Sequence, residues 1–566
     1  MTARMRATNG LAGESACPTK THGFFRSAGV VSAAVSLSRI TGLVREMAMA
    51  RLFGAGAVYD AFLLGFRIPN LTRNLFAEGA LSSAFIPILS QYLATKGKRE
   101  AAELSNVLAT ALFVVVGAVC IVGMIVSPEL VRLMAPGFEQ VPGKFQLTVT
   151  LTRIMFPFLA MVALAAQAMG VLNACDRYGI PAMASAVFNV GSVAFGLALG
   201  FTVGRSLGLD LIHSMAYGVL AGGILQLLWQ VPSLLRVGFS FRPSFDFGHP
   251  GMRQILRLML PAVLGSAAVQ INMIVNTNLA SSITDASGHV INGPVSWLGY
   301  AFRFVQLPIG VFGVAIASAT LPAISRSAAV GHMDEFRDTI ARSLGTVMLL
   351  TIPSSVGLAV LGESMIGIVY QGRRFQPFDT HQTAVALTCY SVGLAGYGAT
   401  KILAPAFYAL NDARTPMLVS LASIAVNLAA ALALLRFAGM GHAGLALSTS
   451  VVALFAAAAL FAILRVRVHG LHGGRLRSSA FRIAAASALM GAVCRASSYG
   501  IHLAAGAGRL AQFADVAISI PLGVAVFYAT ARALGVEELE AVRAACYTSI
   551  RNAPRPEVGD PPARNR

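Results

Sequence analysis

Charged residues are scarce in this sequence of 566 residues. Asp, Glu, Lys and Arg together account for 12% of the chain, whereas hydrophobic residues account for 56%. The mean hydropathy of +0.70 is far above the range of soluble globular proteins. The scarcity of charge therefore excludes a soluble domain and predicts a chain that resides in a lipid bilayer.

Cysteine is also scarce, and the motifs of common enzymes are absent. The six cysteines are scattered without metal-ligand spacing, so we interpret them as small core residues. The sequence has no Walker motif, nucleophile arrangement or metal-ligand cluster, and His213, His442 and His502 are isolated and form no proton-relay pattern. It predicts a membrane transporter rather than an enzyme, with no cofactor or metal, driven by an ion gradient or the membrane potential. The cysteines are Cys17, Cys120, Cys175, Cys389, Cys494 and Cys546.

Long apolar runs make up most of the chain. A helix needs about 20 residues to cross a hydrocarbon core ~30 Å thick, and many runs reach this length. The pattern predicts an all-α polytopic membrane protein with about fourteen transmembrane helices. The expected helices span residues 27–53, 58–94, 104–134, 146–175, 180–204, 211–236, 253–283, 294–325, 336–370, 380–410, 415–437, 441–466, 480–505 and 510–533.

Positive charge is concentrated in the loops between these helices. The net charge is +19, and clusters of basic residues are separated by even numbers of spans. The positive-inside rule requires this spacing if all clusters face the cytoplasm. We therefore expect residues 1–26 and 536–566 to be cytoplasmic tails, with no cleaved signal peptide. A nucleic-acid partner is not expected, because the charge lies in short loops rather than on one face of a domain.

Two parts of the sequence resemble each other. The segment "DAFLLGFRIPNLTRNLFAEGALSSAFIPILS" resembles "YAFRFVQLPIGVFGVAIASATLPAIS", and "LNACDRYGIP" resembles "LNDARTP". The near-constant offset predicts two parallel six-helix repeats, at 27–238 and 252–468, followed by two extra helices at 478–535. The matched pairs are Pro69 and Pro308, Pro87 and Pro322, Asn173 and Asn411, and Pro181 and Pro416, at offsets of 239, 235, 238 and 235. Two such lobes are expected to enclose a central substrate cavity and to rock about it.

The first two helices carry charges in apolar surroundings. Each central charge costs roughly 2.5–3.5 kcal/mol, so these residues need partners or water and must face an interior. The acidic residues either form structural ion pairs, such as Arg39 with Glu46 or Arg67 with Asp60, or line the cavity. Arginines outnumber acids five to three, so some guanidinium groups remain to bind an anion such as pyrophosphate. The charged residues are Arg39, Arg45, Glu46, Arg51, Asp60, Arg67, Arg73 and Glu78, with Arg303 and Lys401 in the second lobe.

A longer segment carries a specific resemblance. "SRITGLVREMAMARLFGAGAVYDAFLLGFRIPNLTRNLFAEGALSSAFIPILS" resembles the N-terminal signature of the MurJ (MviN) family of lipid II flippases, and the similarity extends to about residue 535. The resemblance implies the MOP exporter fold, with two lobes in a V and a groove at 478–535 for the undecaprenyl tail. It implies flipping of lipid II across the bacterial plasma membrane for peptidoglycan biosynthesis. The implied partners are lipid II, membrane lipids and the cell-wall synthesis machinery.

The resemblance also implies a set of substrate-binding residues. The arginines essential in the family correspond to Arg39, Arg45, Arg73 and Arg303, whose implied role is to hold the pyrophosphate and first sugar. Ser38, Asp60 and Glu78 also match cavity positions of the family, and Arg67 stands where the family often has lysine.

One departure concerns sodium. Some family members bind sodium through acidic residues of helices 7 and 11, whereas here Ala431 follows Asn427 by one turn and helix 7 offers amides. Such in-span amides bind substrate or cation, or form interhelical hydrogen bonds. We therefore expect the membrane potential to drive transport. The amides of helix 7 are Gln270, Asn272, Asn276 and Asn278.

Three other functions remain open at this point. Another MOP-type exporter is the nearest, either a flippase for an O-antigen type of polyprenyl-pyrophosphate-linked glycan or a multidrug antiporter. The arginines of the first two helices would repel a cationic drug. A non-transporting scaffold for cell-wall synthesis would need no buried charges.

Overall fold

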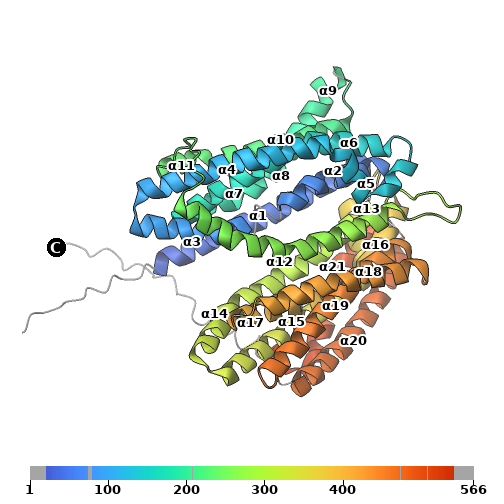
Figure 1. Ribbon diagram of the computed structural model, residues 1–566. Helices are drawn as coiled ribbons and strands as arrows, with labels where there is room; N and C mark the ends of the chain where they lie inside the picture. Colours follow the sequence, from blue (N-terminus) through green and yellow to red (C-terminus); the bar gives the residue numbers. More distant parts are fainter. Residues whose placement is uncertain (1–20, 74–79, 207, 472, 507, 541–566) are drawn as a thin grey trace, which may run out of the picture.

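The fold consists of two helical bundles with an additional helix pair. The computed structural model describes residues 21–73, 80–206, 208–471, 473–506 and 508–540. Figure 1 shows one bundle built from the N-terminal part of the chain and a second from the C-terminal part, with α20 and α21 packed on the second. The all-α fold class is confirmed.

The N-lobe contains six transmembrane segments, three of which are interrupted by a break that lies within the described residues. Prolines at or beside several breaks remove a helical hydrogen bond, as Pro157 does between α6 and α7. The segments are α1 (Thr21–Phe53), α2 (Ala57–Arg73) with α3 (Ala80–Thr95), α4 (Lys98–Ile125) with α5 (Ser127–Met134), α6 (Lys144–Met155) with α7 (Phe158–Ala174), α8 (Gly179–Phe201), and α10 (Leu211–Leu228) with α11 (Val231–Arg236). Two short pieces, η2 (Pro136–Gln140) and α9 (Val203–Ser206), lie in the connections.

The C-lobe repeats this arrangement and is followed by the extra helix pair. A π-helical turn, η3 (Ile309–Gly313), interrupts the segment that corresponds to the α2–α3 segment. The segments are α12 (Pro250–Ser281), α13 (Pro294–Pro308) with η3 and α14 (Val314–Val330), α15 (Met333–Tyr370), α16 (Pro377–Ser391) with α17 (Leu394–Ala409), α18 (Arg414–Arg436), α19 (Gly441–Arg467), α20 (Gly473–Ala505) and α21 (Arg509–Ala533). The described residues thus form fourteen segments, each matching a predicted helix within about two turns. Residues 21–26 and 537–540, predicted to lie in tails, are helical.

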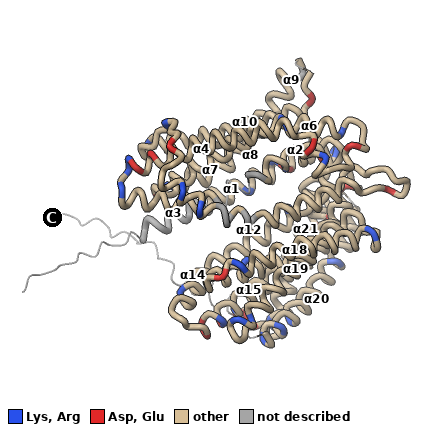
Figure 2. Tube along the Cα trace, in the orientation of Figure 1, with Lys and Arg blue, Asp and Glu red and all other residues tan. Residues whose placement is uncertain are grey.

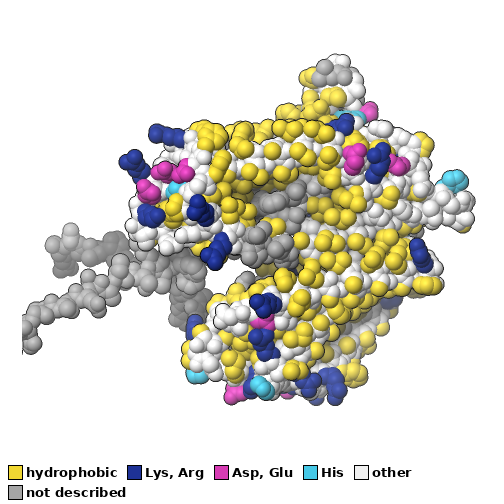
Figure 3. All heavy atoms as spheres, in the orientation of Figure 1, with side chains coloured by type: hydrophobic (Ala, Val, Ile, Leu, Met, Phe, Trp, Pro, Cys, Tyr) yellow, Lys and Arg dark blue, Asp and Glu magenta, His cyan; other side chains and the backbone are white. Residues whose placement is uncertain are grey.

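The outer surface is that of a multi-pass membrane protein. Nine segments of the described chain are long and apolar enough to cross a membrane. Figure 2 shows Lys and Arg gathered toward the ends of the helices, and Figure 3 shows hydrophobic side chains over their outward faces. The remaining segments are shorter, interrupted or carry charges, as α1 does.

The internal repeat is visible in the backbone. Asp176 after α7 and Asn411 after α17 both adopt a left-handed conformation, with φ of 58° and 57°. At each corner the next N–H bonds back to a carbonyl of the last helical turns, at 2.8 Å and 2.9 Å. The offset of these corners equals that of Pro181 and Pro416. The structure therefore pairs Asn411 with Asp176, and the predicted pairing with Asn173 is wrong by three residues.

The lobes meet at one end and separate toward the other. In Figure 1 they converge at the right, where α2 and α13 begin, and diverge at the left. Figure 3 shows the surface hollowed between them on the left. We call these the closed end and the open end.

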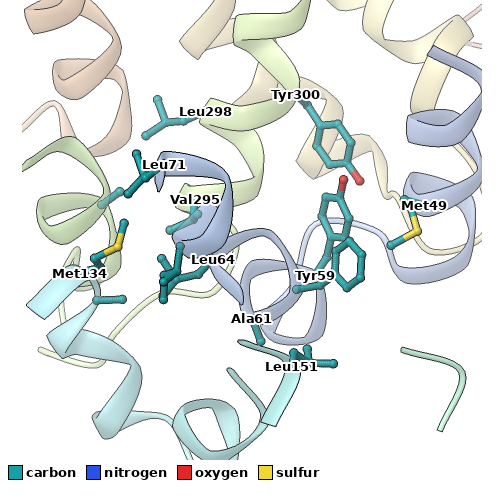
Figure 4. Packing of buried hydrophobic residues seen from close by; sticks show 14 of the residues in the cluster. Met49, Tyr59, Ala61, Leu64, Leu71, Met134, Leu151, Val295, Leu298 and Tyr300 are labelled. Carbon is teal, nitrogen blue, oxygen red and sulfur yellow. The ribbon is translucent and has the colours of Figure 1, made fainter. Parts of the chain in front are cut away.

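Buried aromatic rings fill the closed end. Figure 4 shows Tyr59 of α2 and Tyr300 of α13 pointing toward each other, and their stacked rings have centroids 5.0 Å apart. Tyr300 also contacts Tyr370 at 4.5 Å and Phe375 at 5.3 Å between centroids. These four residues, which we call the aromatic plug, join the N-lobe to the C-lobe. Because all four are buried, the plug excludes water from this end.

Gly54 allows the chain between α1 and α2 to approach the C-lobe closely. Its φ is 70°, and a Cβ there would lie 2.3 Å from the carbonyl oxygen of Arg374. Gly54→Ala should cost about 1–2 kcal/mol for the left-handed backbone and more for the clash, lowering the Tm. Gly97→Ala is the matched control, because Gly97 has φ of 85° but no atom within 4 Å of its added Cβ. Equal loss of Tm in both variants would contradict the close approach.

Candidate functional site

Asp60 fastens the N-lobe to the C-lobe at the closed end. It lies in the first turn of α2 and is 1% exposed. Its Oδ1 accepts hydrogen bonds from the backbone N of Ser296 at 2.9 Å and from Ser296 Oγ at 2.5 Å. Its Oδ2 accepts from the backbone N of Gly293 at 2.8 Å. Asp60 thus caps the N-terminus of α13 from the other lobe, where a negative charge is stabilised.

Lys144 supplies the opposite charge for Asp60. Its Nζ lies 2.9 Å from Asp60 Oδ2 and 2.9 Å from Asn292 Oδ1, and 3.9 Å from the ring centroid of Phe138. Both members of the ion pair have side chains 1% exposed. The carboxylate that the sequence paired with Arg67 is therefore bound to Lys144. Removing either partner would leave an uncompensated buried charge.

Helix α1 and the α13–η3 segment face each other antiparallel across the lobe interface. At the closed end, a Cβ on Gly293 would lie 2.9 Å from the carbonyl oxygen of Ala55. Further toward the open end, a Cβ on Gly310 would lie 2.5 Å from Arg39 Nη1. We call this pair of segments the α1–α13 seam. Side chains and glycines make its contacts.

An ion pair bridges the middle of the seam. Arg303 Nε lies 2.6 Å from Glu46 Oε1, and Tyr370 Oη donates a hydrogen bond to Glu46 Oε2 at 3.3 Å. The Glu46 side chain is 11% exposed, whereas that of Arg303 is 50% exposed. Solvent therefore reaches the guanidinium of Arg303 but hardly reaches the carboxylate of Glu46. Another anion can approach Arg303 from the same side as the solvent.

Arg45 is held beside this pair by aromatic rings. Its Cζ lies 5.7 Å from the ring centroid of Phe66 and 5.4 Å from that of Phe188, as in cation–π contacts. Arg45, Glu46 and Arg303 line one cavity of about 60 Å³ together with Ser192 of α8 and mostly apolar residues of α1, α2 and α10. A cavity of this size holds a few water molecules and is closed to larger ligands in this conformation.

Positive charge exceeds negative charge along the interlobe region. Arg67 of α2 donates from Nη1 to Thr277 Oγ1 of α12 at 2.6 Å, so a hydroxyl rather than a carboxylate receives this bond. Among the described residues, Glu46 is the carboxylate that faces the seam, because Asp60 is bound to Lys144. The interlobe arginines are Arg39, Arg45, Arg67 and Arg303. This surplus of guanidinium groups suits an anion with several phosphate oxygens.

The remaining predicted residues occupy other places. The carbonyl of Ser38 accepts a hydrogen bond from Asn189 Nδ2 at 3.2 Å, within the N-lobe. Asp60 lies at the closed end, outside the Arg45 cavity. Arg73 ends α2, but its side chain and the whole of Glu78 lie outside the described residues. Their substrate contacts stay predictions.

Two residues of the site, Lys144 and Tyr370, were missed from the sequence, and Glu46 was named but paired with Arg39 instead of Arg303. Glu46 follows Arg45 in helix 1, and its charge inside a span was a usable signal. Lys144 begins α6 and resembled an ordinary charge at a helix end. Tyr370, the last residue of α15, carried no signal at all. Only the fold shows that these side chains meet partners from distant helices.

The C-lobe amides bond to one another. Asn427 Nδ2 donates to Asn276 Oδ1 at 2.9 Å, and Asn276 Nδ2 donates to Thr449 Oγ1 at 2.9 Å. Ser448 Oγ donates to Asn427 Oδ1 at 3.2 Å. The side-chain oxygens of Asn276 and Asn427 thus already receive donors, and Ala431 contributes no carboxylate. Two other amides of α12 differ, because the buried Gln270 Oε1 and Asn272 Oδ1 receive no hydrogen bond from the described residues. The neutral Asn276–Asn427 network joins α12, α18 and α19 and does not fit a sodium site.

Comparisons with known proteins agree with this geometry. The family model described as lipid II flippase MurJ matches residues 49–507. A lipid II flippase MurJ of Burkholderia cenocepacia is 34% identical over 78% of this chain and 84% of its own length. A probable lipid II flippase MurJ of Rhizobium meliloti is 34% identical over 89% of this chain and 93% of its own length.

Solved structures show the same fold. A lipid II flippase MurJ in an inward closed conformation has a TM-score of 0.72 at 24% identity, over 90% of this chain and 99% of that chain. A multidrug resistance MATE family transporter of the MOP superfamily, in an inward-facing conformation, has a TM-score of 0.61 at 14% identity, over 77% of this chain and 94% of that chain. The expected MOP exporter fold is confirmed. With the family model covering most of the sequence, this chain belongs to the lipid II flippase MurJ family, whose members are membrane transporters.

Proposed function

We propose that this protein flips lipid II, the undecaprenyl-pyrophosphate-linked precursor of peptidoglycan, from the cytoplasmic to the outer leaflet by alternating access. The surplus of guanidinium groups in the interlobe region carries the proposal. Among the described residues, four arginines face this region, and the carboxylate that faces it is Glu46. The relatives that match the chain bear the name of this activity.

The pyrophosphate is proposed to replace Glu46 as the partner of Arg303. A phosphate group offers the planar guanidinium two parallel hydrogen bonds, and Arg45 stands next to the pair to take a second phosphate. Glu46 keeps its hydrogen bond from Tyr370 when Arg303 leaves. Arg39 lies seven residues before Glu46 on α1, which places it about 10 Å closer to the open end. We propose that the pyrophosphate contacts Arg39 before it reaches Arg303. Ser38, Arg67, Arg73 and Glu78 are assigned to the headgroup on the family match.

The proposed orientation places the open end in the cytoplasm. Basic residues of several loops lie at that end, as the positive-inside rule requires, and both termini are then cytoplasmic. Asp60 and the aromatic plug then form the outer closure. The exposed apolar faces of α20 and α21, including Leu510 and Phe513, are proposed to hold the undecaprenyl tail. In the cell, the flippase would supply the cell-wall synthesis machinery.

The membrane potential is proposed as the driving force. Each negative charge moved outward across a potential that is negative inside gains about 2.3 kcal/mol per 100 mV. The pyrophosphate carries such charges, so its outward movement needs no bound ATP. The neutral Asn276–Asn427 network supports a transport cycle without sodium.

Complementation of a flippase-depleted bacterium tests the function. We expect the wild-type chain to restore growth and to clear lipid II from the inner leaflet, and Arg45→Ala to do neither at equal expression. Arg436→Ala is the control, because Arg436 is an exposed arginine in the last turn of α18. If the well-expressed wild type fails, the substrate is a different polyprenyl-pyrophosphate-linked glycan. Normal clearance by Arg45→Ala would refute the anion site.

A further inference from the structure

A buried carboxylate lies between α15, α20 and α21, on helices that do not line the Arg45 cavity. Asp515 is 0% exposed. Its Oδ2 accepts hydrogen bonds from Ser364 Oγ at 2.5 Å and Ser498 Oγ at 2.8 Å, and its Oδ1 accepts from Ser519 Oγ at 2.8 Å. His502 Nε2 lies 3.5 Å from Oδ2, and the imidazole is 33% exposed. Three helices thus converge on one charge.

This cluster corrects the view of His502 as an isolated residue. The turn between α20 and α21 folds the two helices back on each other and brings His502 beside Asp515. His502 Nδ1 also lies 3.1 Å from the carbonyl oxygen of Gly506 in that turn. The imidazole therefore stands between the solvent at the closed end and the buried carboxylate.

We propose that Asp515 and His502 form a proton-binding site that fills and empties from the closed end. With one proton, the pair is neutral overall, which is the state that a low-dielectric interior favours. Loss of that proton leaves a buried negative charge supported by three hydroxyl groups. Uptake of a second proton neutralises Asp515 and weakens its charge-assisted hydrogen bonds to the serines. The number of protons bound at this site therefore sets the strength of the hydrogen bond between Asp515 of the α20–α21 hairpin and Ser364 of α15.

Other titratable groups near the cluster are already occupied. Glu363, next to Ser364 on α15, faces His381 of α16 at 3.5 Å, and both side chains are about 60% exposed. Arg509 of α21 donates to the carbonyl oxygen of Gln371. The Cys494 thiol of α20 donates to the carbonyl oxygen of Ser519 at 3.4 Å. Among the described residues, the cationic group within reach of Asp515 is therefore His502.

Helix α15 connects this cluster to the seam. Ser364 and Tyr370 lie six residues apart on α15, a rise of about 9 Å. Tyr370 donates to Glu46, the partner of Arg303. Gln512 of α21 also donates from Nε2 to Oε1 of Gln371, which directly follows Tyr370, at 2.9 Å. A change in the hydrogen bonds between the α20–α21 hairpin and α15 can therefore shift Tyr370 and its hydrogen bond to Glu46, with no contact to the substrate.

Infrared titration of the purified protein in nanodiscs, without substrate, tests the proton site. We expect the carbonyl stretch of a protonated carboxylic acid to appear as pH falls, and the Asp515→Asn variant to lack it. His502→Gln, at a partly exposed position that tolerates change, should move the midpoint by at least about one pH unit, a tenfold change in proton affinity. Absence of the band at every pH, an unmoved midpoint, or a band that sodium suppresses would each overturn the proposal.

Transport assays test the link to the proposed function. In liposomes with the closed end outward, we expect the wild-type rate of lipid II flipping to change roughly tenfold with external pH, and Asp515→Asn to show no such change. Ser487→Ala is the control, because this buried serine on α20 donates only to the carbonyl oxygen of Ile483 one turn earlier. Equal pH dependence in Asp515→Asn and wild type would refute the link. If the wild type does not flip lipid II, the proposed function fails, while the infrared result still decides the proton site.

Discussion

Replacing Asp60 with asparagine is expected to open the closed end and to abolish transport. The change leaves Lys144 buried and unpaired and weakens the cap on α13. Breaking a buried pair in this way costs about 3–5 kcal/mol, enough to shift a conformational equilibrium by more than about 100-fold. A cysteine placed at Ser192, which lines the Arg45 cavity, should then react with a membrane-impermeant maleimide added outside intact cells.

Two further variants distinguish the effect of the unpaired Lys144 charge from an unspecific effect of replacing an aspartate. Asp60→Asn combined with Lys144→Met should recover part of the closure, because the unpaired charge is removed as well. Asp285→Asn is the matched control, since Asp285 accepts hydrogen bonds only from the exposed turn between α12 and α13. Labelling of Asp60→Asn at the wild-type rate would show that the Asp60 carboxylate does not hold the lobes together.

Exchanging the two charges of the seam, as Glu46→Arg with Arg303→Glu, is expected to preserve folding and to stop transport. The exchange keeps an ion pair between the lobes but removes the guanidinium from α13, where we place the pyrophosphate. Each hydrogen bond to a charged group contributes about 1.5–3 kcal/mol, so loss of two bonds slows flipping by at least about 100-fold. Flipping rate and Tm are both measured.

A single variant refines the role of Arg303. Arg303→Lys keeps the charge but loses the planar, two-pronged donor, so we expect an intermediate loss of about tenfold. Wild-type transport by the charge-exchanged protein would show that Glu46 and Arg303 form a purely structural link. Loss of Tm in the exchanged protein but not in Arg303→Lys would point to misfolding instead.

The number and position of the transmembrane segments could be predicted from the sequence, because lipid imposes a minimum apolar length on each helix. The repeat was also predictable, since matched prolines and turn residues recur at similar offsets. The error at Asn173 arose because identical letters were matched, whereas the backbone corner needs a residue that tolerates positive φ, which Asp176 does. The interruption at Ile309–Gly313 left no distinct pattern beyond Pro308.

The charged residues of the site could be predicted, but their partners could not. Hydropathy shows that a charge lies in a span, while its partner depends on how distant helices meet. Asp60 bonds to Lys144 rather than to Arg67, and Glu46 bonds to Arg303 of the other lobe rather than to Arg39. In each case the sequence favoured a partner close in the chain. Both correct partners are more than 80 positions away, so only tertiary structure identifies them.

The way α1 and α13 touch affects how fast the lobes can part. Two helices packed through apolar faces must expose that surface on separating, which costs about 25 cal/mol for each Å². The α1–α13 seam instead meets through a guanidinium, a carboxylate and glycines. Water or phosphate oxygens can replace each of these contacts in turn, so the polar part of the seam separates without exposing apolar surface. The four buried rings of the aromatic plug, in contrast, become exposed when the closed end opens. The seam therefore adds little to the barrier between conformations, and most of that barrier lies at the plug.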